Sequence, residues 1–202
     1  MKSKLLEIFL RRHACHLFQA DRTIPPDDLG FILEAGRLSP SSFGLEPWKF
    51  IVLSTQHAKL ALQAACFQQP QVGTASVVIV LLAKLAEMDP DSDYLRSLMA
   101  REYPGDALEG ALKNYRAFHA ATDVKAWCEH QCHIAAANMM TAAAGMKIDS
   151  CAIGGFDPAE VQRLLDLDPA RRHPALILAF GYCAQPAGEK MRLPLEELVE
   201  YR

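Results

Sequence analysis

The segment 75–82 constrains the fold more than any other part of the chain. It reads Ala-Ser-Val-Val-Ile-Val-Leu-Leu and is apolar on both of the faces that a strand presents. Such a run is typical of a central strand in a sheet that is covered on both sides. Two further apolar runs, 50–53 and 176–182, predict other buried strands, and a shorter strand is expected at 150–153.

Apolar residues at helical spacing predict helices around these strands. The alanine-rich segment 127–145 is apolar nearly all round from Ile134 onward, so we expect it to be buried. Thr23 or Asp27 could cap a helix that runs to Ser39. A terminal strand or docking arm is expected at 195–199. The other expected helices cover residues 3–12, 56–67, 92–102, 107–118 and 158–167.

Length and patterning favour a single domain. The 202 residues contain no internal repeat, low-complexity tract or flexible linker, and 50% of them are hydrophobic. We therefore expect one α+β domain across residues 1–202. The segment at about 87–123 is polar and variable in pattern, and we expect it to form a helical excursion from the core.

Charge and hydropathy argue against several classes of partner. The net charge is −3 and there is no basic tract, which argues against nucleic acid. No segment has the apolar length that a bilayer requires, and charges up to Arg12 interrupt any signal-peptide core. We expect a cytoplasmic protein. Its cysteines lack the spacing of a secreted framework and predict reduced thiols, several of them buried: Cys15, Cys66, Cys128, Cys132, Cys151 and Cys183.

The stretch 39–52 is the first candidate for a binding site. Turn-forming residues pass directly into an aromatic and β-branched segment, which predicts a loop followed by a strand. Pro40 stiffens this loop, Gly44 permits a close approach, and Ser41 and Ser42 offer hydroxyl and amide groups. Such a loop could hold an anion or a polar ring edge. The alternative is an ordinary connection between a helix and a strand.

Two basic segments and one glycine pair are further candidates. Arg11, Arg12, His13 and His16 could grip a phosphate, although cations at the end of a helix also complement its dipole. The tail segment 190–194 is either a second cationic site or a solvated loop. Gly154 and Gly155 precede a capped helix, so their N–H groups could face a ligand, although a tight turn is the commoner meaning.

A metal site on the segment 127–133 is a weaker alternative. Cys128 and Cys132 lie one helical turn apart, with His130 and His133 nearby. All of these groups would lie on one helix, and no second pair follows at a zinc-ribbon distance, so we expect no metal. The chain also contains no nucleophile elbow, P-loop or dinucleotide fingerprint.

In this order, the motifs resemble those of the nitroreductase family. The agreement comprises Ser-Pro-Ser-Ser followed by Pro-Trp-x-Phe-Ile-Val, the Arg-His pair, the Gly-Gly-Phe-Asp turn and the basic tail that ends in proline. The resemblance implies an α+β fold with a mixed, mostly antiparallel sheet flanked by helices. It also implies an intertwined homodimer with FMN at the subunit interface, in which the loop 40–44 belongs to the partner subunit.

The resemblance further implies which residues hold FMN. Arg12 and His13 match the family's basic motif, Ala14 replaces its usual serine, and His16 stands where a lysine or arginine is common. Gln71 replaces a lysine, and Gly154 replaces a glutamate. The implied FMN-binding residues are Arg12, His13, Ala14, His16, Pro40, Ser41, Ser42, Gly44, Gln68, Gln71, Ile153, Gly154, Gly155, Lys190 and Arg192.

The implied reaction is an oxidoreduction. Hydride would pass from NAD(P)H to flavin N5 and then to a nitroaromatic, a quinone or a similar small-molecule acceptor. No side chain need be catalytic, because the backbone at Gly154 and Gly155 would orient N5. Tyr115 and Phe118 are candidate substrate-binding lids. Two alternatives stay open: a specialised reductase or dehydrogenase for a defined metabolite, and an FMN-binding protein without turnover.

Overall fold

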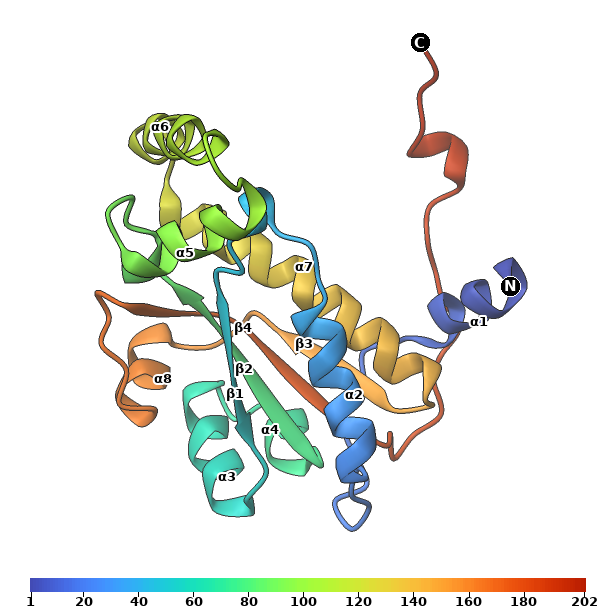
Figure 1. Cartoon of the computed structure of the whole chain (residues 1–202). Helices are drawn as coiled ribbons and strands as arrows, with labels where there is room; N and C mark the ends of the chain where they lie inside the picture. The colour runs from blue at the N-terminus through green and yellow to red at the C-terminus, as the bar shows by residue number, and fades with distance from the viewer.

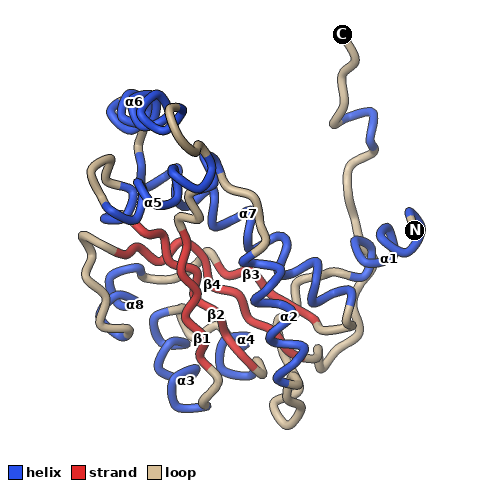
Figure 2. Tube along the Cα trace, in the orientation of Figure 1, coloured by secondary structure: helices blue, strands red, loops and turns tan.

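A four-stranded sheet forms the centre of the computed structural model, which describes residues 1–202 (Figures 1 and 2). The strands lie in the order β1-β2-β4-β3, and every neighbouring pair is antiparallel. The segment predicted to be central is β2, whose residues Val77 to Ala83 are all buried. The prediction of an antiparallel-rich sheet is therefore confirmed. The strands are β1 Trp48–Leu53, β2 Val77–Lys84, β3 Asp149–Ile153 and β4 Arg172–Gly181.

Helices cover both faces of this sheet, and the alternation of residues along β2 separates two cores. Ile79 and Leu81 face one core with α2 and α7, whereas Val78 and Val80 face the other with α3, α4 and α8. The sheet is thus buried on both sides, which explains why β2 carries no polar face. The helices are α1 Lys2–Arg11, α2 Pro26–Arg37, α3 Gln56–Ala65, α4 Pro70–Thr74, α5 Asp93–Glu102, α6 Ala107–Ala120, α7 Val124–Gly145 and α8 Pro158–Leu164.

The long helix α7 is the main packing partner of the sheet. Asp123 caps it by accepting a hydrogen bond of 3.1 Å from the amide of Ala126. Small residues let α2 lie close to α7: a Cβ placed on Gly36 would lie only 2.9 Å from the sulfur of Met139. Although α7 is largely apolar, neither it nor any other helix of the chain has the length and hydropathy needed to span a bilayer.

Three local predictions require correction. The helix α2 begins after Pro25 and has no side-chain cap, so neither Thr23 nor Asp27 caps it. The segment 68–71, which its glutamines and proline predict to be a break between a helix and a strand, contains the start of the short helix α4, because Pro70 suits the first turn of a helix. The segment 195–199 forms no terminal strand but only a 3-10 turn, Leu195–Glu197, within an exposed tail that leaves the body of the molecule, and the alternative of a docking arm stays a prediction (Figure 1).

The expectation that all six cysteines are reduced is wrong for one pair. Cys15 and Cys183 form a disulfide, with Cα atoms 5.7 Å apart. They meet because the segment after α1 pairs first with the edge strand β3 and then with the chain just beyond β4: Ala14 forms a parallel bridge with Ser150, and Phe18 forms an antiparallel bridge with Cys183. The other four cysteines are buried free thiols.

Candidate functional site

The basic segment that follows α1 runs alongside the edge strand β3. The amide of Cys15 donates a hydrogen bond of 3.1 Å to the carbonyl of Ser150, beside the bridge between Ala14 and Ser150. This pairing fixes the backbone on which Arg12, His13 and His16 stand. The predicted basic motif therefore begins at the C-terminal end of α1, where Arg12 is the cap residue, and continues along the edge of the sheet.

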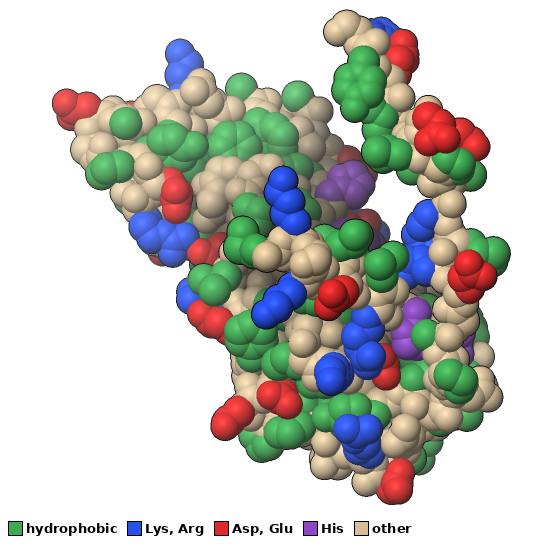
Figure 3. Space-filling model, turned by 90° about the vertical axis from the view of Figure 1, so that its right-hand side faces the viewer, with side chains coloured by type: hydrophobic (Ala, Val, Ile, Leu, Met, Phe, Trp, Pro, Cys, Tyr) green, Lys and Arg blue, Asp and Glu red, His purple; other side chains and the backbone are tan.

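The C-terminal tail arches over this basic segment. The Nζ atom of Lys190 donates to the carbonyl of Phe9 at 2.7 Å and also to the carbonyl of Arg12. Beneath the arch lies a cavity of about 520 Å³. Figure 3 shows lysine or arginine and histidine side chains beside the base of the tail. The residues that line this basic cavity are Leu10, Arg12, His13, Ala14, His16, Ala187, Gly188, Glu189, Lys190, Met191 and Arg192.

The basic cavity is rich in positive charge. Partial burial lowers the pKa of Lys190, and the like charges of Arg12 and Arg192 lower it further. One carboxylate, that of Glu189, also lines the cavity. Converging cations that disfavour one another's charge form a site that an anion would stabilise. The structure thus brings together six of the predicted cofactor-binding residues: Arg12, His13, Ala14, His16, Lys190 and Arg192.

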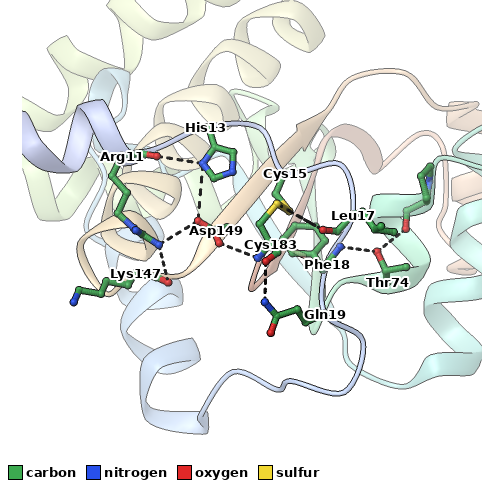
Figure 4. The surroundings of a disulfide bond; sticks show 11 residues. Arg11, His13, Cys15, Leu17, Phe18, Gln19, Thr74, Lys147, Asp149 and Cys183 are labelled. Atoms are coloured by element: carbon green, nitrogen blue, oxygen red, sulfur yellow. Dashed lines mark hydrogen bonds and ion pairs between the residues drawn. A yellow bond between two sulfur atoms is a disulfide. The ribbon is translucent and has the colours of Figure 1, made fainter. Parts of the chain in front are cut away.

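Asp149, the first residue of β3, orients this site, and sequence reasoning missed it. Its Oδ1 lies 3.3 Å from Arg11 and 4.0 Å from Nδ1 of His13, while its Oδ2 accepts from the amide of Cys183 at 2.9 Å (Figure 4). The Nδ1 of His13 lies 3.2 Å from the carbonyl of Arg11. The Nε2 of His13 is buried without a hydrogen-bond partner, which leaves a polar atom available to a ligand.

The glycine turn lies at the other end of β3. Gly154 and Gly155 are exposed, and a Cβ on Gly154 would meet nothing within 4 Å, so open space lies above the backbone here. The side chain of Gln69 donates to the carbonyl of Gly155 at 2.6 Å. The buried Gln71 donates to Oε1 of Gln69 at 2.9 Å, so the turn is connected to α4.

Of the predicted residues in this region, Gln71 acts on the turn only through Gln69. Gln68 is exposed and has a φ of 59°, in the left-handed region. Ile153 is buried as the last residue of β3. Sequence reasoning missed Gln69, because a glutamine before a short helix carries no motif of its own.

The loop 40–44 lies elsewhere on the molecule. Its Ser42 amide donates to Oε1 of Gln131 on α7 at 3.0 Å, and its Ser41 hydroxyl accepts from the amide of Glu46 at 2.9 Å. Pro40, Ser41 and Gly44 line a cavity of about 370 Å³ that shares no residue with the basic cavity. One chain therefore does not bring the serine loop and the basic motif together.

The prediction that Tyr115 forms a substrate lid is wrong for this structure. Its side chain is fully buried, and its hydroxyl donates to the carbonyl of Met88 at 2.8 Å. Burial also raises the pKa of Tyr115 above its usual value. Phe118 is partly buried and packs between the rings of Phe43 and Trp127, at centroid distances of 5.3 and 5.4 Å. Tyr115 belongs to the same core as Ile79 and Leu81 of β2, and Phe118 packs against this core. A ligand-covering role for Phe118 stays a prediction.

The cysteines of α7 face the interior. Cys128 and Cys132 are buried, and burial raises the pKa of each thiol to about 12. His130 and His133 are exposed on the same helix. The structure contains no group of three His, Cys, Asp or Glu side chains that could hold a metal ion.

Comparison with known proteins agrees with this architecture. The model of the nitroreductase family matches residues 10–182. A Staphylococcus haemolyticus protein, named as a candidate NAD(P)H nitroreductase, is 34% identical over 100% of this chain and 98% of its own length. A nitroreductase-like protein from Streptococcus mutans has the same fold, with a TM-score of 0.89, 22% identity and full coverage of both chains.

A second solved structure was determined with a bound flavin. It is a candidate nitroreductase from Exiguobacterium sibiricum in complex with FMN, with a TM-score of 0.84 and 21% identity over 98% of this chain and 97% of that one. At this identity the likeness concerns the fold. The match of the family model over residues 10–182, together with the full-length relative at 34% identity, shows that this chain belongs to the nitroreductase family.

Proposed function

We propose that the protein is an FMN-dependent oxidoreductase that transfers hydride from NAD(P)H to a nitroaromatic, a quinone or a similar small-molecule acceptor. Family membership supports this proposal, as do the name of the Staphylococcus haemolyticus relative and the FMN complex of the Exiguobacterium sibiricum protein. FMN would supply the redox chemistry, and the protein would supply binding, orientation and charge.

The observation that carries the proposal is the cation cluster under the tail. A phosphate monoester carries a charge of roughly −1.5 to −2 near neutral pH and offers three strong acceptor oxygens. Arg12, Lys190 and Arg192 provide matching donors around a cavity large enough for such a group. Burial and the like charges of Arg12 and Arg192 lower the pKa of Lys190, so protonation of Lys190 is disfavoured in the absence of an anion. A bound phosphate would offset the repulsion among these cations.

Other features of the site fit the remainder of FMN. The buried side-chain polar atoms that lack a hydrogen-bond partner are Nε2 of His13 and Oγ of Ser150. His13 belongs to the basic segment and Ser150 to β3, and these two elements are joined by the bridge between Ala14 and Ser150. From Ser150 to Gly154 the strand advances by about 13 Å. FMN could therefore lie along β3, with its phosphate at the basic cavity and its ring at the glycine turn.

The side chains have binding and positioning roles in this proposal. Arg12, Lys190 and Arg192 would hold the phosphate. His13 would offer its unpartnered Nε2 to FMN from the lining of the basic cavity. The glycine turn would place main-chain N–H groups against the ring, and Gln69 would keep that turn in place. No side chain of the site need act as a general acid or base.

We also propose that the site is completed in a homodimer. The serine loop at 40–44 is built to offer hydroxyl and amide groups, yet it lines a separate cavity in its own chain. A second copy could place its loop over the first copy's basic cavity. This arrangement would give each dimer two equivalent FMN sites.

An anaerobic visible spectrum before and after addition of NADH or NADPH tests the function. We expect a bound-flavin absorbance that bleaches rapidly and returns when a quinone or nitroaromatic is added. A colourless protein that does not take up FMN would contradict the proposal. A yellow protein that never bleaches would instead favour an FMN-binding protein without turnover.

A further inference from the structure

We infer that the Cys15–Cys183 disulfide is a thiol-exchange site whose redox state sets how tightly the protein holds FMN. The inference rests on the proposed function, because it concerns the cation cluster assigned to the FMN phosphate. A dithiol reductant would be the reactant at this site. The oxidised form would be the tight-binding form.

The disulfide anchors the start of the tail that arches over the basic cavity, and neither cysteine lines that cavity itself. Cys15 belongs to the basic segment, and Cys183 is the residue from which the tail departs after β4, 168 positions away in sequence. Seven residues beyond Cys183, Lys190 returns to the carbonyl of Arg12. The segments 12–15 and 183–190 therefore form a ring, with the disulfide at one end and the lysine contact at the other.

Non-covalent bonds around the disulfide would keep the fold intact without it. The side chain of Gln19 donates to the carbonyl of Cys183 at 2.8 Å, and Asp149 accepts from the amide of Cys183 (Figure 4). The amide of Ala184 donates to the carbonyl of Leu17 at 2.9 Å. Breaking the disulfide would thus remove a restraint on the tail without removing strand pairing.

The surroundings also suit the reduced form. The carbonyl oxygen of Leu17 lies 3.2 Å from the sulfur of Cys15 and 3.6 Å from that of Cys183. After reduction, either thiol would find this oxygen in place as a hydrogen-bond acceptor. The pair can therefore exist in both states without a buried thiol that lacks a partner.

The exposure of the two sulfurs sets the order of the exchange. Cys15 is fully buried, whereas Cys183 is partly exposed, so an external thiolate would attack the sulfur of Cys183. The disulfide bond breaks, a mixed disulfide forms at Cys183, and Cys15 leaves as a thiolate that takes up a proton. The second thiol of the reductant then attacks the mixed disulfide and releases the Cys183 thiol. The reductant ends as a disulfide, and the protein has gained two electrons and two protons.

Loss of this restraint would weaken FMN binding through preorganisation. Lys190 and Arg192 act on the phosphate only while the tail stays over the basic segment. With the disulfide intact, the six exposed residues 184–189 that lead to Lys190 start from a residue that is covalently fixed to the basic segment. With the disulfide broken, only hydrogen bonds to Gln19, Asp149 and Leu17 hold that start in place, so keeping Lys190 over the basic segment would cost more of the binding free energy. We expect reduction to raise the Kd for FMN by about tenfold.

The test compares FMN binding by the air-oxidised protein and by the protein reduced with dithiothreitol, using the quenching of FMN fluorescence. The Cys183→Ser variant provides the matched control, since it lacks the disulfide and should bind like the reduced protein whether or not dithiothreitol is present. Thiol titration after denaturation should find four thiols in the oxidised chain and six in the reduced chain. Trypsin should cleave after Lys190 or Arg192 faster in the reduced form.

The outcomes separate this inference from the proposed function. Equal Kd values for the oxidised and reduced protein would overturn the inference and leave the FMN proposal intact. Six thiols in the oxidised protein would also overturn it, because no disulfide would then exist. FMN binding in neither state would overturn both, and the trypsin result would still report whether the disulfide restrains the tail.

Discussion

The side-chain amide of Gln69 donates a hydrogen bond of 2.6 Å to the carbonyl oxygen of Gly155. The same nitrogen donates to the carbonyl of Cys66 at 3.0 Å, so one side chain connects the end of α3 to the turn after β3. The amide of Asp157 adds a second connection, to the carbonyl of Ala65 at 2.9 Å. The glycine turn is therefore held from one side and open on the other.

Gln69→Glu should slow flavin reduction, because an ionised carboxylate keeps the shape of the side chain but cannot donate to either carbonyl. We expect a loss of about 1–2 kcal/mol in stability and a fall of about tenfold in the rate of bleaching by NAD(P)H. Stopped-flow absorbance measures the rate. Gln162→Glu is the matched control, since Gln162 also donates to a backbone carbonyl, that of Arg172 at 3.1 Å. If both variants slowed reduction equally, Gln69 would have no specific role at the turn.

Gly154→Ala should weaken FMN binding without weakening the fold. The backbone there does not require a positive φ, and the new methyl group would point into open space. Unfolding of the FMN-free protein should therefore change by less than about 0.5 kcal/mol. A ring placed over the turn would meet the methyl group, and we expect the Kd for FMN to rise at least about tenfold, by roughly 1.4 kcal/mol.

Gly110→Ala controls for the substitution itself. Gly110 is exposed on α6, and a Cβ there also meets nothing within 4 Å. This variant should gain up to about 1 kcal/mol in stability from helix propensity and bind FMN as the parent does. Unchanged FMN affinity in Gly154→Ala would show that the ring does not lie over this turn.

Hydrophobic patterns within single segments of the sequence predict most of the strands and helices. Hydrophobic runs and helical spacing located β2, β4 and α7, because burial on both sides leaves a strand without a polar face. The expectation that α7 is buried all round is wrong for this chain, since Ile134 and Ala137 are exposed. The same patterns could not place Tyr115, because the sequence pattern of an amphipathic helix is the same whether such a residue covers a ligand or packs into the core. Only the bond from its hydroxyl to Met88 distinguishes the two.

Contacts between distant segments explain what sequence reasoning missed. The disulfide joins residues 168 positions apart, and it depends on the segment after α1 pairing both with β3 and with the chain just beyond β4. Asp149 and Gln69 matter through side chains that reach other elements, and neither belongs to a recognisable motif. The basic motif was visible, since Arg12 and Lys190 stand among other cations. Their convergence on one cavity required the structure.

Lys190→Met should reduce FMN affinity and its dependence on salt. The substitution keeps much of the side-chain length but removes one cation from the cluster around the phosphate. A lost charge-assisted hydrogen bond of about 1.5–3 kcal/mol corresponds to a rise of roughly 10–150-fold in Kd. Fluorescence titrations at low and high ionic strength should show a shallower salt dependence in the variant. Lys113→Met, on the exposed face of α6, should change neither quantity.

His173 should make the fold less stable in mild acid. Burial lowers the pKa of His173 from its ordinary value of 6.5, and Lys125 lowers it further, although Nε2 lies 3.1 Å from a carboxylate oxygen of Glu129. Below pH 6.5 the unfolded chain binds a proton at this histidine before the folded chain does. Its stabilising contribution is therefore present above pH 6.5 and is lost as the pH falls toward the lower, folded-state pKa.

Urea unfolding of the parent and of His173→Gln between pH 7.5 and 5 measures this contribution. The variant should lose stability less steeply below pH 6.5, and the difference in slope should not exceed about 1.4 kcal/mol per pH unit, the limit for one proton. His57→Gln is the control, because His57 is exposed on α3. Parallel curves for the parent and His173→Gln would contradict this prediction. They would mean that Glu129 compensates fully for the burial of His173, so that the pKa of His173 is the same in the folded and unfolded chains.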